Sequence, residues 1–256
     1  MKLLALKNRS GKAQKHLAQA ILLVGIAGVA SLFAFTGINN KNESQKPERL
    51  TLSLIKDTSF RSATKRAPLE EKEMILIEAS KILRTEIHSV TDGKHKDFVP
   101  DDFKNVYPII DFMLAVDSVN GHAIYFKGEV YRLLNNNDRF VEYFQRYLNL
   151  ESTAKPQLQK VTNARLCYET PHGYCEKRTA WISQLLANYY YQNGLREPEE
   201  SKKMEAFSIA TRHIQNVRIH FPAGFSSSSV TLSTVELEKN LKANIGKLSA
   251  VKSQAN

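Results

Sequence analysis

The chain has 256 residues, of which 42% are hydrophobic and 24% are charged, and it carries a net charge of +10. This length and balance are typical of a globular protein with one sizeable domain, and they argue against a disordered chain. Removing the five Lys and Arg residues of the range 1–16 leaves a charge of only +5, with Lys and Glu interspersed. Nucleic acid is therefore not expected as a partner.

An uncharged stretch of 22 residues, Leu17–Ile38, follows the basic leader 1–16. About 20 apolar residues span the hydrocarbon core of a bilayer as a helix. The positive leader places the N-terminus in the cytoplasm and the bulk of the chain on the other side, in the periplasm or an equivalent compartment. A cleaved signal peptide is the alternative, because Ser31 and its small neighbours suit a signal peptidase. We favour an uncleaved, single-pass transmembrane anchor, since the apolar run continues well beyond Ser31.

Residues 39–67 are expected to form a linker. The range 39–49 is polar and typical of a stalk, whereas Leu50–Ile55 alternates briefly and leaves a short strand or an extended segment open. A helical domain is expected over residues 68–222, and its first helix begins near Pro68. The apolar stripe of that helix consists of Ile75, Ala79, Ile82, Leu83 and Ile87.

A second helix is expected over Phe103–Val116. It contains Pro108, which either kinks the helix or marks a later start. Its apolar face would consist of Phe103, Val106, Ile110, Met113 and Leu114.

The stretch Gly121–Ala154 contains two amphipathic runs around an Asn-rich turn, and Asp138 is a candidate N-cap for the second run. Ile124, Gly128 and Tyr131 share a face of the first run. Apolar residues at helical spacing also line the second run, namely Phe140, Phe144, Tyr147 and Leu148. This pattern predicts a helical hairpin that buries one stripe of each helix.

These 34 residues resemble the tetratricopeptide repeat, a helical hairpin with the signature W-x2-L-G-x2-Y…A-x3-F…P. Gly128, Tyr131 and Phe144 match the signature. Four other positions depart from it, because Trp, Leu, Ala and Pro are replaced by Ile124, Lys127, Phe140 and Ser152. The resemblance implies an all-α fold of antiparallel hairpins. The ring of Phe140 is expected to fill the space opposite Gly128.

Beyond the hairpin, Pro156–Leu166 is a candidate short helix. Glu176–Asn193 is expected to be a helix that ends at Gly194 as its C′ residue, and a further helix is expected between Pro198 and Pro222. Residues 223–256 comprise a Ser-rich break and an amphipathic helix opened by a capping box of Ser233 and Glu236. That helix either docks on the preceding hairpin as a cap or forms a free tail.

Cys167 and Cys175 are the only cysteines, and both follow the apolar stretch. In an oxidising compartment their spacing predicts a disulfide, with two reduced thiols as the alternative. A metal site of Cys167, Cys175 and His172 would lack a fourth ligand, so no metal site is expected. No residue pattern marks a nucleophile, a phosphate loop or a cofactor site, so no catalytic residue and no cofactor are predicted.

In tetratricopeptide proteins the exposed face of each first helix lines a concave groove. By position, the resemblance implies a partner-binding face of His122, Tyr125, Glu129, Arg132, Trp181, Gln184, Asn188 and Tyr191. A mixed solvent-exposed face is the alternative for these residues. Aromatic side chains and arginine are favoured at binding hot spots.

The sequence therefore predicts a membrane-anchored helical domain that acts as a scaffold and binds another protein or peptide near the membrane. The alternative is a membrane-anchored hydrolase of the cell envelope. Convergent carboxylates or histidines with shifted pKa values would favour the hydrolase.

Overall fold

The computed structural model describes residues 50–92, 97–153, 164–170, 172–227 and 231–254. Every regular element in these ranges is a helix, as the sequence predicts. The α-helices are α2 (Leu52–Lys56), α3 (Thr58–Arg66), α4 (Leu69–Thr91), α5 (Val106–Val116), α6 (Gly121–Leu133), α7 (Asn137–Thr153), α8 (Glu176–Arg196), α9 (Glu200–His220) and α10 (Thr234–Gln254). Two 3-10 helices, η1 (Pro100–Phe103) and η3 (Ala164–Glu169), lie between them.

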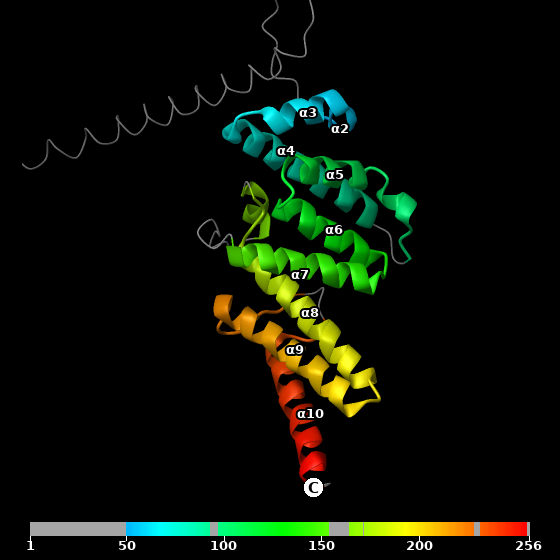
Figure 1. Ribbon diagram of the computed structural model, residues 1–256, viewed down its shortest axis with the longest axis vertical. Coiled ribbons are helices and arrows are strands. Elements are labelled where there is room, and N and C mark those ends of the chain that lie inside the picture. Colours follow the sequence, from blue (N-terminus) through cyan, green and yellow to red (C-terminus); the bar gives the residue numbers. More distant parts are fainter. Residues whose placement is uncertain (1–49, 93–96, 154–163, 171, 228–230, 255–256) are drawn as a thin grey trace, which may run out of the picture.

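The helices form an elongated stack in which order in space follows order in the chain (Figure 1). The helices α2 and α3 lie at one end, and α10 extends from the other end. Three apolar clusters follow one another along this stack. The first joins α2 to α6, the second is mostly aromatic and joins α6, α7 and α8, and the third joins α8, α9 and α10.

The helical domain begins earlier than expected, because α2 and α3 lie inside the range 39–67 that was predicted as a linker. Thr51 caps α2 and Asp57 caps α3. Ile55 is fully buried, and Phe60 stacks on Phe112 of α5 with ring centroids 5.8 Å apart. This burial of apolar side chains stabilises two helices that would be too short to persist alone.

The first long helix, α4, begins after Pro68 and packs on α5. Proline lacks the N–H that an inner helical turn requires. Pro108 is the third residue of α5, so this helix starts later than Phe103, which belongs to η1 and is fully buried.

The central hairpin consists of α6 and α7, with two corrections to the expected detail. Asn136, not Asp138, caps α7, and its side chain accepts a hydrogen bond from the Arg139 N–H at 3.2 Å. The ring opposite Gly128 belongs to Phe144 instead of Phe140. A β-carbon at position 128 would lie 2.5 Å from two ring carbons of Phe144.

The hairpin of α8 and α9 has the same kind of contact, in which a glycine of one helix faces a phenylalanine ring of the other. Gly194 does not end α8 but lies inside it, where a β-carbon would come within 2.6 Å of the Phe207 ring on α9. The absent side chain lets α9 approach, so this glycine serves helix packing and not helix termination.

The capping box of Ser233 and Glu236 is confirmed, because the Ser233 N–H donates to the Glu236 carboxylate at 2.9 Å. The Glu236 N–H in turn donates to the Ser233 hydroxyl at 3.3 Å. Of the two expectations for the last helix, docking is correct: Leu237 and Leu241 of α10 are buried against α8 and α9.

The predicted transmembrane stretch Leu17–Ile38 and the stalk 39–49 lie outside the described residues, as does most of the candidate helix Pro156–Leu166. In the part of the chain that the structure describes, none of the helices combines the length and the apolar character that crossing a bilayer requires.

Gly128→Ala should destabilise the protein, because the new β-carbon meets Phe144. That ring is fully buried and is held by the rings of Phe140 and Trp181, so it has no space to retreat. Overpacking of this kind costs ~1–3 kcal/mol, against a gain in helix propensity of about 1 kcal/mol. We therefore expect a net loss in the free energy of unfolding, measured by urea denaturation with circular dichroism.

Gly246→Ala is the matched control, since no atom lies within 4 Å of a β-carbon built at this position of α10. At this position only the higher helix propensity of alanine has an effect, so the free energy of unfolding should rise by up to about 1 kcal/mol. Equal changes in both variants would contradict the close approach of α6 to α7.

Candidate functional site

Half of the predicted partner-binding residues are not accessible. His122 and Gln184 are 0% exposed, and Asn188 and Tyr191 are each 6% exposed. Gln184, Asn188 and Tyr191 lie on α8, so the predicted face of that helix is not an open groove, and His122 of α6 is buried as well.

The chain itself covers that face of α8. The Asn188 side chain accepts from the Leu232 N–H and donates to the Leu232 carbonyl, both at 3.1 Å. Gln184 also donates to this carbonyl and accepts from the Thr234 hydroxyl at 2.7 Å. These amides therefore hold the segment before α10 in place, which explains why polar side chains are buried there.

The other four predicted residues lie close together at the junction of α6 and α8. The rings of Tyr125 and Trp181 meet edge to face, with centroids 5.6 Å apart. Arg132 lies over the Trp181 ring at 6.0 Å and binds both carboxylate oxygens of Glu129, at 2.9 and 3.1 Å. Tyr125 was expected on an outward face, yet its ring also packs on Phe126 and Phe144 and belongs partly to the core.

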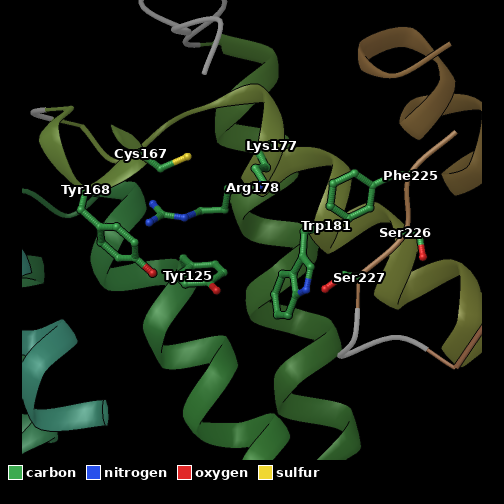
Figure 2. A pocket seen from close by; sticks show the side chains of 9 residues that line it. All are labelled: Tyr125, Cys167, Tyr168, Lys177, Arg178, Trp181, Phe225, Ser226 and Ser227. Atoms are coloured by element: carbon green, nitrogen blue, oxygen red, sulfur yellow. The ribbon is translucent and has the colours of Figure 1, made fainter. Parts of the chain in front are cut away.

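A pocket of about 330 Å³ opens at this junction, and we call it the Trp181 pocket (Figure 2). Its main lining residues are Tyr125, Tyr168, Lys177, Arg178, Trp181 and Phe225. They come from α6, from η3, from the first turns of α8 and from the segment after α9. Ser226 and Ser227 complete one wall. The volume is within the range of small-ligand sites.

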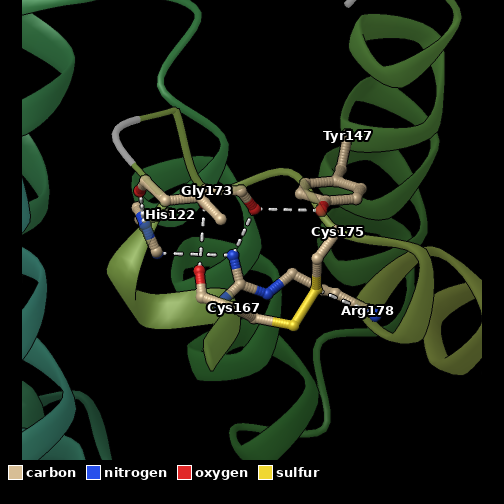
Figure 3. The surroundings of a disulfide bond; sticks show 7 residues. His122, Tyr147, Cys167, Gly173, Cys175 and Arg178 are labelled. Carbon is tan, nitrogen blue, oxygen red and sulfur yellow. Dashed lines mark hydrogen bonds between the residues drawn. A yellow bond between two sulfur atoms is a disulfide. The ribbon is translucent and has the colours of Figure 1, made fainter. Parts of the chain in front are cut away.

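A disulfide between Cys167 and Cys175, which closes a loop (Figure 3), adjoins the pocket, because Cys167 is part of the pocket lining. The predicted bridge between Cys167 and Cys175 is confirmed, with Cα atoms 5.6 Å apart. The two sulfurs lie at bonding distance, which favours the bridge over the alternatives of two reduced thiols or a metal site with His172. Among the described residues, no group of three or more metal-binding side chains is present.

Gly173 joins this loop to three helices. It has a φ of +74°, and a β-carbon there would lie 2.3 Å from the backbone nitrogen of His122. Only glycine suits both the left-handed conformation and this contact. Its carbonyl accepts hydrogen bonds from Tyr147 of α7 at 3.0 Å and from Arg178 of α8 (Figure 3).

Arg178 is the most unusual residue of the site. It is only 5% exposed, and its guanidinium lies over the rings of Tyr125 and Tyr168, at 4.3 and 5.1 Å from their centroids. Its Nη1 donates to the Gly173 carbonyl and to Nδ1 of His122, while its Nη2 has no hydrogen-bond partner. Contacts with aromatic faces offset part of the cost of burying a cation.

His122 is neutral in this network. Burial, reinforced by the charge of Arg178, lowers its pKa to about 3. Its Nε2–H donates to the Thr170 carbonyl at 2.8 Å, which leaves Nδ1 as the acceptor for Arg178. His122 is thus part of the support of the pocket and not a binding residue.

The sequence interpretation missed Lys177, Arg178, Tyr168 and Phe225. Arg178 is in a helical stretch of both polar and apolar residues, where a charged residue normally faces water. The apolar periodicity of the sequence therefore does not indicate that Arg178 is buried. Tyr168 does carry a signal, since it is adjacent to Cys167 in a loop that the disulfide fixes. Phe225 is separated from Trp181 by the whole of α9, and its contact depends on the tertiary fold.

The chain matches no protein-family model, no curated protein and no solved structure. The chemistry of the Trp181 pocket is therefore the main guide to function.

Loss of the disulfide should destabilise the protein by about 2–3 kcal/mol, because the bridge closes a loop between residues 8 apart in the chain. We suggest replacing Cys167 and Cys175 together by serine, since serine at position 175 can still cap α8. Urea unfolding should give the same midpoint for this variant and for the reduced wild type. A variant as stable as the oxidised wild type would contradict the prediction.

Stability should fall as the pH drops from about 6.5 toward 3, because the unfolded chain protonates His122 while the folded protein keeps it neutral. Each such histidine contributes a slope of up to ~1.4 kcal/mol per pH unit. His213, whose pKa burial lowers to about 4, contributes in the same direction. In unfolding experiments across this range, His122→Gln should show a shallower slope than wild type, and His213→Gln is the matched comparison. An unchanged slope in both variants would be inconsistent with neutral buried histidines.

Proposed function

We propose that the protein is a membrane-anchored domain that binds another protein or peptide, with the Trp181 pocket as the contact site. The observation that carries this proposal is the convergence of Trp181, Tyr125, Lys177 and Arg178 on one open pocket with a rigid support. Aromatic residues and arginine around a partly buried cavity are the typical composition of binding hot spots.

The type of fold supports the proposal. Gly128 and Phe144, two of the three residues that match the tetratricopeptide signature, face each other across α6 and α7. The second hairpin has a similar contact between Gly194 and Phe207. A tetratricopeptide-like array of hairpins would present its first helices to a partner, and α6 and α8 contribute Tyr125, Lys177, Arg178 and Trp181 to the pocket.

The disulfide supports the proposed location. Structural disulfides persist in oxidising compartments and are rare in the cytosol. An outer domain behind an anchor at Leu17–Ile38 would experience such conditions.

The alternative of a cell-envelope hydrolase has weaker support. His122 has the strongly lowered pKa that an active site can show, yet it is fully buried, and both of its ring nitrogens are engaged by Thr170 and Arg178. We therefore favour partner binding.

The test is a variant that fills the pocket without touching the core. Ser226 is exposed on the pocket wall, so Ser226→Phe should block entry and leave folding intact. The full chain, solubilised from membranes in detergent, would be used to capture partners, which are then quantified by mass spectrometry. We expect a decrease of about tenfold for the partner that uses the pocket, equivalent to ~1.4 kcal/mol.

Ser208→Phe is the matched control, because Ser208 is exposed on α9 and does not line the Trp181 pocket. It should retain the partner at the level of the wild type. A partner set that Ser226→Phe leaves unchanged would overturn the proposed site.

A further inference from the structure

Arg178 is a buried cation without an ion-pairing carboxylate in the described part of the chain. Its contacts are two carbonyl or imidazole acceptors and two aromatic faces, all of them neutral. Its Nη2 lacks any acceptor. Buried donors are almost always satisfied in folded proteins, and buried charges are almost always paired, so this site is short of a negative group.

The neighbouring charges increase this shortage. Lys177 lies on the same pocket wall, and Arg84 lies over the ring of Tyr168 at 4.6 Å from its centroid. Glu129 binds Arg132 through both oxygens. Among the described residues, no carboxylate forms an ion pair with Arg84, Lys177 or Arg178. The pocket therefore has a surplus of positive charge.

Most of the remaining lining of the pocket is aromatic. Trp181, Tyr125 and Phe225 supply ring surfaces. In Figure 2 the ring of Tyr125 lies by the guanidinium of Arg178, whereas Trp181 and Phe225 lie farther along the pocket. A bound group would thus meet both cations and aromatic rings in the same pocket. The guanidinium charge is delocalised over three nitrogens, so it stabilises an anion in the pocket whichever nitrogen the anion contacts.

We infer that the Trp181 pocket binds a carboxylate carried next to an aromatic ring, as in a partner segment where an acidic residue adjoins a phenylalanine. Lys177 and Arg178 hold the carboxylate, and Trp181 and Phe225 contact the ring. This inference rests on the proposed function for the source of the ligand, a protein segment. The chemistry of the site is independent of that source.

The binding assay uses the full chain in detergent and the emission of Trp181. Trp181 is the only tryptophan, so its fluorescence reports on the pocket alone. The first pair of probes is the blocked dipeptide acetyl-Glu-Phe-amide and its neutral analogue acetyl-Gln-Phe-amide. The second pair is 3-phenylpropanoate and 3-phenylpropanamide, which present the same chemistry without a peptide. We expect each acid to bind about tenfold more tightly than its amide, with a difference that shrinks as salt is added.

Two variants test the residues. Lys177→Gln alters a partly exposed side chain, so the fold should persist, and it should weaken binding of the acids several-fold while leaving the amides unchanged. Arg178→Gln should remove most of the preference for the acid, with circular dichroism as the check on folding. Lys202→Gln is the control, since this lysine is on α9 at the other end of the hairpin from Lys177, and it should change nothing.

The outcomes separate this inference from the proposed function. Equal binding of acids and amides, or no change in the fluorescence of Trp181 with any probe, overturns the carboxylate inference. The proposed function is then still tested by partner capture with Ser226→Phe. Acid binding that Lys177→Gln does not weaken also overturns it. Binding of 3-phenylpropanoate but not of the acidic dipeptide overturns the protein segment as the source and counts against the proposed function, while it supports the carboxylate chemistry.

Discussion

The middle of the molecule depends on the buried guanidinium of Arg178. It links the disulfide loop, through the Gly173 carbonyl, to His122 on α6, and Tyr147 on α7 binds the same carbonyl. Three consecutive helices and a loop thus share one set of hydrogen bonds among side chains that are almost completely buried. Each member is costly to remove, because the others would then be left unsatisfied at a place where hydrogen bonds are strong. The Trp181 pocket is built on this network, so its rigidity is a direct result of the burial of Arg178.

Close approach of helices determines which surfaces remain open. Gly128 and Gly194 each allow a phenylalanine of the next helix to contact the backbone, which brings the two helices of each hairpin together. The segment before α10 then covers the far part of α8 through Gln184 and Asn188. The first turns of α8 and the adjoining part of α6 stay accessible, and the pocket lies there. The candidate site thus lies at one end of α8, away from the part that the segment before α10 covers.

Sequence patterns were sufficient where the cause of a structure is local. Apolar periodicity predicted the long helices, the Ser233–Glu236 pair predicted the start of α10, and the spacing of Cys167 and Cys175 predicted the bridge. Sequence patterns failed where a local structure is caused by a contact with a distant part of the chain. Gly194 resembles a helix terminus until Phe207 is placed against it, and α2 becomes helical because Ile55 finds a core. In the candidate site, Tyr125 and Trp181 could be found from their position on a helix. Arg178 could not, because its burial requires the loop and both tyrosines.

The linear stack also has a consequence for the order in which the chain can fold during synthesis. Most helix contacts join neighbours in the sequence, so each helix can find its place soon after the next one has left the ribosome. The disulfide loop depends on more of the chain, because its anchoring carbonyl contacts α7 and the first turn of α8, and its Gly173 packs on α6. A nascent chain that stops before Cys175 would expose the aromatic cluster of α6 and α7 without its cover. Completion of residues 167–178 is therefore the step in biosynthesis that lets this cluster be covered.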